Sequence, residues 1–153
     1  MKAILIGAPG AGKGTQAAIL KNEHGLRHVA SGDLLRAAVA ADTSLGRQAK
    51  LYMERGELVP DHIVIGMILE HLRTTVSDSG VIFDGFPRTL EQARALEQAL
   101  APTGQGIDTV LYVDVPQEVL FERLTQRYQC TECGTIYNWG INPPEQEGLC
   151  DRC

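Results

Sequence analysis

Short apolar runs alternate along the chain with longer stretches of helical periodicity. The apolar runs, which have strand character, cover residues 3–6, 28–30, 81–84 and 109–115. The stretches between them carry apolar residues at the three- and four-residue spacing of amphipathic helices. Strands that alternate with helices predict an α/β fold around a parallel sheet.

Capping residues and glycines predict where these helices begin and end. We expect a helix over residues 15–24 that Gly25 ends, and a helix over 45–55 that Ser44 caps and Gly56 ends. We also expect Asp61 to cap a helix that extends to about residue 74. The segment from Thr89 to Gln92 has the pattern of a capping box at the start of another helix.

A last helix is predicted after the fourth strand. Pro116 suits its first helical position, where a missing N–H costs nothing. Arg123 and Arg127 lie four residues apart and would share one face of this helix. Its apolar positions Val119, Leu120 and Leu124 are expected to be buried.

Length, composition and net charge limit the classes of protein to which this chain can belong. A chain of 153 residues with 44% hydrophobic content suits one domain with a single core. The net charge of −5 argues against general binding to nucleic acid or to an anionic membrane, since both require a basic surface. No secretory signal and no apolar run of roughly 18 residues is visible, so we expect a cytosolic protein.

The first apolar run leads into a glycine-rich segment, Gly-Ala-Pro-Gly-Ala-Gly-Lys-Gly-Thr, at residues 7–15. Glycines at positions 7, 10, 12 and 14 permit backbone angles that turn successive N–H groups around phosphate oxygens. Lys13 adds a positive charge, and the N-terminus of the following helix also favours an anion. The segment predicts a nucleoside triphosphate site; the alternative is a strand-to-helix turn without a ligand.

One position departs from the pattern G-x-x-x-x-G-K-[ST]. Residue 14 is glycine, and the hydroxyl comes one residue later, at Thr15. We therefore expect Thr15 to contact phosphate rather than to coordinate a metal.

The third apolar run ends in Asp84, which a parallel sheet would bring beside the phosphate-binding loop. A carboxylate there can orient Mg²⁺ or its waters, although aspartate also caps turns. The sequence Asp84-Gly-Phe-Pro-Arg88 predicts a tight turn that presents Arg88 from the same edge. A planar guanidinium suits bidentate recognition of phosphate.

All four cysteines lie between residues 130 and 153. Cys130 and Cys133 form one C-x-x-C pair, Cys150 and Cys153 form a second, and residues 134–149 separate the pairs. This spacing is typical of a four-thiolate structural zinc site. Gly134 and Gly148 permit the tight turns that such a site needs. Free or disulfide-bonded cysteines are the alternative.

Three motifs in this order resemble adenylate kinase: residues 7–15, Ser31-Gly-Asp-Leu-Leu-Arg36, and Asp84-Gly-Phe-Pro-Arg-Thr89. The resemblance covers the whole chain and implies a three-layer α/β fold, the parallel-sheet P-loop nucleoside monophosphate kinase fold. It implies a core over residues 1–30 and 60–126, a helical AMP-binding flap over 31–59, and part of a zinc-binding lid over 127–153. The flap agrees with the length of residues 31–80, which exceeds a simple crossover between strands.

The implied reaction is ATP + AMP = 2 ADP, which serves nucleotide salvage and energy homeostasis in a cytoplasmic monomer. The implied metal ions are Mg²⁺ with ATP and a structural Zn²⁺ in the lid. Within the wider family, Gln92 favours AMP over uridine or cytidine monophosphate. The zinc ligands would be Cys130, Cys133, Cys150 and Cys153.

The resemblance also implies a role for each matching residue. The residues that would hold AMP are Ser31, Arg36, Glu57, Leu58, Val59, Gly85, Phe86, Pro87, Arg88 and Gln92. The residues that would contact ATP are Gly10, Ala11, Gly12, Lys13, Gly14, Thr15, Arg123, Arg127, Ile136 and Tyr137. The catalytic residues would be Lys13, Asp84, Arg88, Arg123 and Arg127, with Asp84 orienting Mg²⁺ through water.

Each of these roles has a structural alternative. Ser31 alone could be a helix cap, and Gln92 could be only the capping partner of Thr89. Arg36, Arg123 and Arg127 could be solvated helix charges. The motifs favour the site roles because they occur in series.

Adenylate kinases continue beyond the fourth cysteine, so the resemblance implies that this sequence is an amino-terminal part with weak nucleotide binding and little kinase activity. A non-catalytic zinc and nucleotide-binding module is an alternative. A kinase for another nucleoside monophosphate is a third possibility, within the enzyme class.

Overall fold

The computed structural model describes residues 1–74, 80–104 and 106–153. These residues form two compact units, one of Met1–Ile6 with Lys13–Tyr112 and the other of Gly7–Gly12 with Val113–Cys153. Residues 75–79 and 105, which the predicted core segment 60–126 includes, lie outside the described residues.

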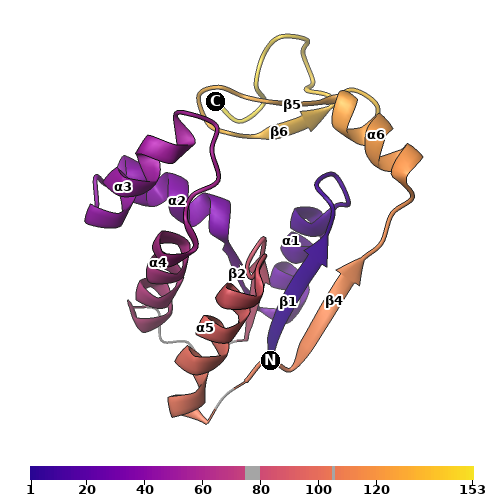
Figure 1. Ribbon diagram of the computed structural model, residues 1–153. Helices are drawn as coiled ribbons and strands as arrows, with labels where there is room; N and C mark the ends of the chain where they lie inside the picture. Colours follow the sequence, from indigo (N-terminus) through magenta and orange to yellow (C-terminus); the bar gives the residue numbers. More distant parts are fainter. Residues whose placement is uncertain (75–79, 105) are drawn as a thin grey trace. The chain divides into compact units, whose positions relative to one another are not determined.

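A four-stranded sheet is the centre of the first unit (Figure 1). Its strands are β1 (Lys2–Gly7), β2 (Arg27–Ala30), β3 (Val81–Asp84) and β4 (Thr109–Val113), in the order β2-β3-β1-β4. Strand β3 pairs in parallel with both β1 and β2. The four predicted apolar runs are therefore confirmed as strands, and the predicted α/β class is confirmed.

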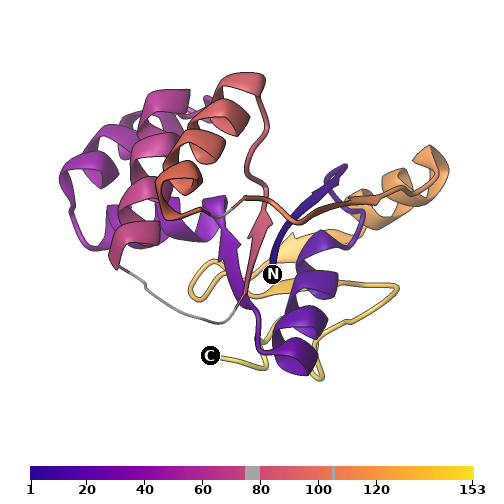
Figure 2. The same cartoon turned by 90° about the horizontal axis from the view of Figure 1, so that it is seen from below.

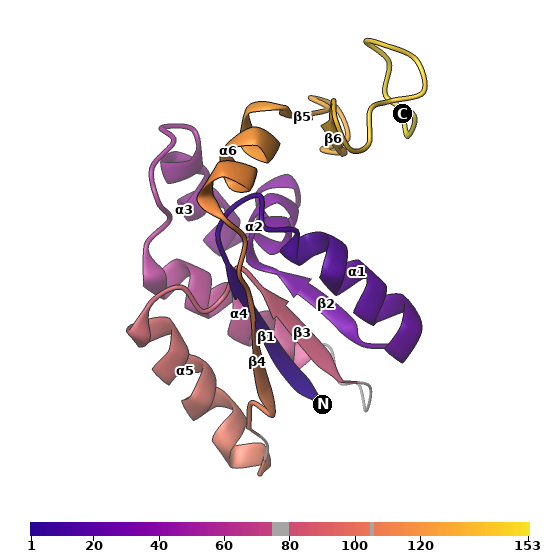
Figure 3. The ribbon, with the colours of Figure 1, turned by 90° about the vertical axis from the view of Figure 1, so that its right-hand side faces the viewer.

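Helices cover both faces of the sheet, as Figure 3 shows. They are α1 (Lys13–His24), α4 (Asp61–Thr74) and α5 (Leu90–Leu100), which the short 3-10 helix η1 (Ala101–Thr103) follows. Phe83 of β3 is buried with Ile68 of α4 and Leu96 of α5. Its neighbour Ile82 is buried on the opposite face with Ala17 of α1. Alternate side chains of β3 thus pack against helices on opposite faces of the sheet. The result is three layers, with helices on either side of the sheet.

Two further helices connect β2 to α4: α2 (Ser31–Ala40) and α3 (Ser44–Met53). Figure 2 shows both lying against α4. Ala49, Ile63 and Met67 form a separate apolar cluster between them. The predicted helical flap over residues 31–59 is therefore a helix pair with its own small core, while the domain boundaries themselves remain a prediction.

The second unit contains α6 (Gln117–Thr125) and an antiparallel pair of strands, β5 (Arg127–Gln129) and β6 (Ile136–Asn138). Tyr128 lies opposite Tyr137 in this pair, and the two rings stack with centroids 5.7 Å apart. Trp139 stacks on the same Tyr128 ring at 4.7 Å. The buried Asn138 side chain donates a hydrogen bond to the carbonyl of Arg123 at 2.9 Å, which ties the strand pair to α6.

The structure corrects three predictions around α6. Pro116 precedes the helix and is not its first helical residue. Arg127 lies in β5, so it does not share a helix face with Arg123. Leu124 is 41% exposed rather than buried, and Val119 and Leu120 are only half-buried. The helix ends at Thr125 because the following residues pair as a strand with β6.

The helix caps also differ from the predictions at two places. Thr43, not Ser44, caps α3, because its hydroxyl accepts a hydrogen bond from the N–H of Gly46 at 3.0 Å. Asp61 is the first residue of α4 rather than its cap. Its carboxylate accepts hydrogen bonds from the side chains of Thr89, which caps α5, and Gln92, which lies in α5. The caps at Gly25 and Thr89 are confirmed: Gly25 has φ +63°, and the Thr89 hydroxyl accepts from the N–H of Gln92.

Two smaller differences concern the N-terminal region. Gly14 lies inside the first turn of α1 with no positive φ, so the predicted special backbone angle at this position is wrong. Ile6, at the end of the apolar run, is 43% exposed. Among residues 1–74, 80–104 and 106–153, none of the helices combines the length and apolar character that a bilayer crossing needs.

Candidate functional site

The glycine-rich loop after β1 adopts the backbone conformation that the sequence predicts at three of its glycines. Gly7, Gly10 and Gly12 have φ of +155°, +82° and +95°, values that residues with a Cβ rarely adopt. The N–H of Ala11 donates to the carbonyl of Ala8 at 3.1 Å, which closes a turn within the loop. A side chain at position 10 would also meet Leu124 at 3.1 Å, so the loop packs against α6 at a glycine.

Arg123 of α6 reaches this loop. Its Nη1 lies 3.4 Å from the carbonyl oxygen of Gly10, and its side chain is half-buried. The structure therefore brings one of the two predicted ATP-contacting arginines to the loop that is predicted to bind phosphate. It does not bring Arg127 there in the same way: Arg127 is an exposed residue of β5.

The start of α1 and the end of β3 lie side by side. Lys13 opens α1, and a Cβ at the next residue, Gly14, would lie 3.7 Å from Oδ2 of Asp84. The Asp84 carboxylate is mostly buried and accepts a hydrogen bond from Nε2 of His28 at 3.2 Å. The strand topology thus brings Asp84 beside the beginning of α1, as the sequence predicts. Thr15 follows as an exposed residue of α1.

The turn after Asp84 gathers two predicted AMP-binding side chains around one carbonyl. The oxygen of Gly85 accepts hydrogen bonds from the Ser31 hydroxyl at 2.8 Å and from Nε of Arg88 at 2.7 Å. Gly85 has φ +71°, and a Cβ there would lie 2.9 Å from Nη2 of Arg88. The backbone angle therefore favours glycine at this position, and a larger residue would also displace the end of the Arg88 side chain.

The remaining predicted AMP-binding residues have different environments. Phe86 is 1% exposed and belongs to the core, so only its backbone is available; the following peptide bond to Pro87 is cis. Leu58 is 86% exposed, Glu57 is exposed, and Val59 packs on the core. On α2, the Arg36 guanidinium pairs with Asp33 at 2.5 Å.

Gln92 is buried at the start of α5 and makes more contacts than a capping box predicts. Its Oε1 accepts from the backbone N–H of Arg88 at 2.8 Å, and its Nε2 donates to Asp61 at 2.6 Å. The Asp61 carboxylate also accepts from the Thr89 hydroxyl at 2.7 Å. Neither contact is the bond back to the N–H of Thr89 that a capping box would form.

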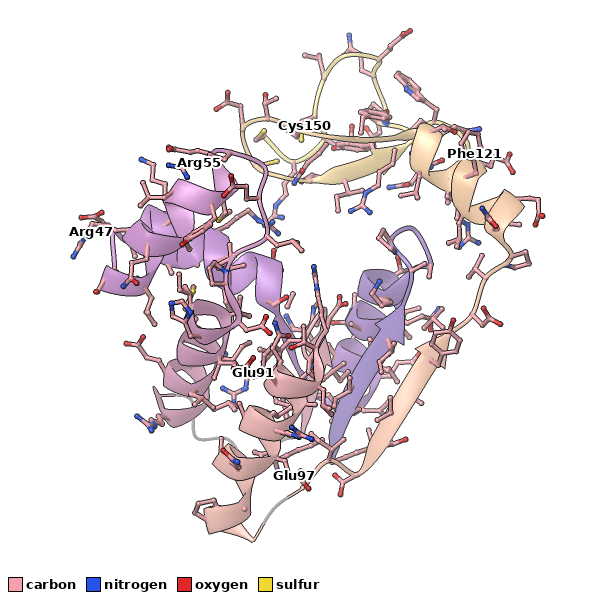
Figure 4. The ribbon with its side chains drawn as sticks, in the orientation of Figure 1. Arg47, Arg55, Glu91, Glu97, Phe121 and Cys150 are labelled. Carbon is pink, nitrogen blue, oxygen red and sulfur yellow. The ribbon has the colours of Figure 1, made fainter. Side chains whose placement is uncertain are left out.

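The four cysteines come together in the second unit. Their sulfurs all lie within 4.8 Å of one another, with Cys130 and Cys153 3.6 Å apart and Cys133 and Cys150 3.5 Å apart. Figure 4 labels Cys150 among these sulfurs. Sulfurs bound tetrahedrally at the usual Zn–S length of about 2.3 Å would lie roughly 3.8 Å apart. The four sulfurs thus fit one tetrahedral metal ion.

A hydroxyl group contacts each of two sulfurs in the cluster. The Tyr137 hydroxyl lies 3.3 Å from the Cys150 Sγ and, as the main cause, lowers the pKa of that thiol to about 6. The Thr135 hydroxyl lies 3.1 Å from the Cys133 Sγ and lowers the pKa of this second thiol. Hydrogen bonds with the neighbouring thiols, that of Cys133 first, raise the pKa of Cys153 to about 12. Four sulfurs this close cannot all ionise cheaply without a cation between them.

Sequence reasoning missed three residues of the site. His28 of β2 contacts Asp84 of β3, and Asp61 of α4 contacts Gln92 of α5. No short sequence motif signals such pairs. Thr135, by contrast, lies two residues after Cys133, so a search for hydroxyls near the thiolates would have found it.

Comparison with known proteins agrees with this geometry. The family model described as "Adenylate kinase" matches residues 5–152. The adenylate kinase of Carboxydothermus hydrogenoformans is 49% identical over 153 residues, which are 100% of this chain and 72% of that protein. The adenylate kinase of Thermodesulfovibrio yellowstonii is 50% identical over the same 153 residues, 71% of its own length.

A third relative, the adenylate kinase of a Geobacillus species, is 47% identical over all of this chain and 71% of its own length. The matches with these three relatives extend over the whole chain. The chain belongs to the adenylate kinase family.

Proposed function

We propose that this chain transfers the γ-phosphoryl group of ATP to AMP, reversibly, and so forms two molecules of ADP. The relatives are named adenylate kinases, and the family model carries the same description. The observation that carries the proposal is the position of Asp84 in the first unit. Its carboxylate lies beside Gly14 at the start of α1 and directly before the Gly85 turn, which bonds Ser31 and Arg88.

In this proposal the loop from Gly10 to Thr15 binds the ATP phosphates. The positive φ angles of Gly10 and Gly12 support this role, because they allow N–H groups to point at one anion. Lys13, Arg123 and Arg127 supply positive charge, and Ile136 and Tyr137 contact ATP from β6. The bond between Arg123 and the Gly10 carbonyl supports the placement of a guanidinium at this loop.

The AMP site is proposed around the Gly85 turn. Ser31 and Arg88 are already held at one carbonyl, so little side-chain entropy remains to be lost when AMP binds. Arg36 and Arg88 would bind the AMP phosphate, and Gln92 the base. The other proposed AMP contacts are Glu57, Leu58, Val59, Gly85, Phe86 and Pro87, of which Phe86 can contribute only its backbone.

The reaction needs no covalent enzyme intermediate. An oxygen of the AMP phosphate attacks the γ-phosphorus of ATP in line, and the bond from that phosphorus to the β–γ bridging oxygen breaks. Lys13, Arg88, Arg123 and Arg127 stabilise the charge that spreads over the transferring group. The hard carboxylate oxygens of Asp84 would hold Mg²⁺ through water, and the ion would supply further charge neutralisation beside ATP.

A coupled assay of ADP formation tests this function. We expect ADP formation with ATP and AMP, at a low rate if little kinase activity is present, and less with ATP alone, since water must be excluded from the site. CMP, UMP and GMP serve as acceptor controls and distinguish a kinase for another monophosphate. No ADP from AMP in a folded chain would contradict the proposal. Tight binding of two adenosines joined by five phosphates, without turnover, would instead favour a non-catalytic module.

We further propose that the four cysteines bind one structural Zn²⁺. The mutual sulfur distances and the hydrogen bonds to Cys133 and Cys150 support a thiolate site. Elemental analysis of the purified chain should find one zinc per molecule, and a strong chelator should lower its melting temperature. An unchanged melting temperature after complete metal removal would contradict a structural role.

We also propose that the chain acts as a cytoplasmic monomer. The sequence carries a net charge of −5, which favours solubility and disfavours association with anionic surfaces. Light scattering on the purified protein tests the oligomeric state, and a molar mass near twice the 16.6 kDa of one chain would contradict it.

A further inference from the structure

The carboxamide of Gln92 belongs to a hydrogen-bond network that joins α4 to α5. Nε2 of Gln92 donates to Oδ1 of Asp61 at 2.6 Å, and Oε1 of Gln92 accepts from the N–H of Arg88 at 2.8 Å. The second carboxylate oxygen of Asp61 accepts from the Thr89 hydroxyl at 2.7 Å. Gln92 itself is only 4% exposed. Both ends of the amide are therefore held by groups of fixed position.

These two partners admit only one orientation of the amide. An ionised carboxylate can only accept a hydrogen bond, and a backbone N–H can only donate one. Rotating the carboxamide of Gln92 by 180° would bring its oxygen against the Asp61 carboxylate and its NH₂ group against the N–H of Arg88. Both new contacts would be repulsive, and a buried amide would lose both of its bonds. Of the two groups that fix the amide, the Asp61 carboxylate is the charged one and the Arg88 N–H is the neutral one.

The fixed amide keeps one N–H hydrogen and one oxygen lone pair for a ligand. A carboxamide has two hydrogens on nitrogen and two lone pairs on oxygen, and Asp61 and Arg88 use one of each. The Watson–Crick edge of adenine offers an acceptor at N1 and a donor at N6, which complement this pair. Hypoxanthine and guanine offer a donor at N1 and an acceptor at O6, which match only the rotated amide.

We propose that Asp61 is a specificity-determining residue: it locks the Gln92 carboxamide in the orientation that accepts adenine and rejects 6-oxopurines. The proposal rests on the AMP-binding role proposed above for Gln92. Asp61 does not touch the nucleotide itself; it acts as a positioning residue through Gln92. Free glutamine side chains can rotate to suit either base, so the discrimination comes from Asp61 and the Arg88 N–H rather than from Gln92 alone.

The test compares the binding of AMP and IMP, which differ at this edge of the base. Calorimetric titration of the whole chain measures both dissociation constants for the wild type, for Asp61→Asn and for Thr89→Val. Asparagine keeps the shape of residue 61, but its amide can donate or accept and so no longer fixes the orientation of Gln92. The Thr89→Val control removes the hydroxyl that contacts Asp61 and leaves the bond between Asp61 and Gln92.

We expect the wild type to prefer AMP over IMP by about a hundredfold, because a mismatched base leaves buried polar groups unpaired. The preference should fall about tenfold in Asp61→Asn, the usual effect of losing a hydrogen bond to a charged group. It should persist in Thr89→Val, whose melting temperature falls through loss of the α5 cap. An unchanged preference in folded Asp61→Asn would overturn the proposal. A wild type that binds neither nucleotide would refute the AMP site itself.

A measurement on the wild type keeps the proposal testable if Asp61→Asn does not fold. The two carboxamide hydrogens of Gln92 give separate NMR signals. We expect one of them, bonded to Asp61, to keep its shift when AMP is added, while the other moves. Equal movement of both signals, or of neither while AMP binds, would overturn the proposal.

Discussion

The hydroxyl of Tyr137 contacts the second cysteine pair at Cys150. It lies 3.3 Å from the Sγ of Cys150 and accepts a hydrogen bond from the N–H of Asp151 at 2.8 Å. Tyr137 is buried in β6, which follows the first cysteine pair, whereas Cys150 belongs to the second pair. One side chain therefore fixes the second pair against the strand next to the first.

Replacing Tyr137 by phenylalanine should weaken metal binding by about tenfold, because outer hydrogen bonds orient and stabilise metal ligands. The measurement is competition for zinc with a chromophoric chelator at constant pH. Tyr128→Phe is the matched control: its ring stacks on Tyr137, but its hydroxyl is one of the buried atoms with no hydrogen-bond partner in the part of the chain that the structure describes. Equal zinc affinity in both variants would show that the Tyr137 hydroxyl does not support the site.

The cap of α3 gives a prediction that separates two neighbouring hydroxyl residues. Thr43→Ala should lower the free energy of unfolding by about 1 kcal/mol, because the N–H of Gly46 loses its acceptor. Ser44→Ala, inside the first turn, should change it far less, since alanine is a better helix former than serine. Urea denaturation at one temperature measures both values. A larger loss in Ser44→Ala would contradict the assigned cap.

Strands and glycine stops could be predicted from the sequence because their signals are local. The apolar run that ends at Asp84 needs no partner to be recognised, and the spacing of Cys130, Cys133, Cys150 and Cys153 already implies a common ion. The choice between Thr43 and Ser44 is different. Either residue can cap a helix, and the turn in which the Thr43 N–H bonds the carbonyl of Ala38 decides between them.

Contacts between distant segments account for the remaining errors. Arg127 continues a helical pattern in the sequence, but Tyr128 pairs with Tyr137, and this pairing draws Arg127 into a strand. Gln92 fits a capping box, yet its amide is held by Asp61, 31 residues earlier. Such partners are set by how α4 and α5 pack, which no periodicity along one helix can reveal.

The close packing of α2 on α3 makes Gly46 a sensitive position. A methyl group there would lie 2.0 Å from the carbonyl oxygen of Ala38, which is backbone and cannot move aside cheaply. Gly46→Ala should therefore lower the free energy of unfolding by about 3 kcal/mol. Gly106→Ala is the control, because a Cβ at Gly106 meets nothing within 4 Å. Similar stabilities for the two variants would mean that the two helices can separate without cost.

The charge of Asp84 gives the last prediction, which concerns catalysis. The carboxylate lies between His28 and the start of α1, and asparagine would keep its size while removing its charge. Asp84→Asn should lower kcat for ATP and AMP by about a hundredfold and raise the Mg²⁺ concentration that gives half the maximal rate. The control is Glu97→Gln on the surface of α5 (Figure 4), which removes one negative charge from the chain, as Asp84→Asn does. It should leave kcat within about twofold of the wild-type value, since exposed charges are well screened. The ADP-forming assay at several Mg²⁺ concentrations measures both effects. If Asp84→Asn slowed the reaction without changing its Mg²⁺ dependence, Asp84 would serve only to hold the turn that follows it at Gly85.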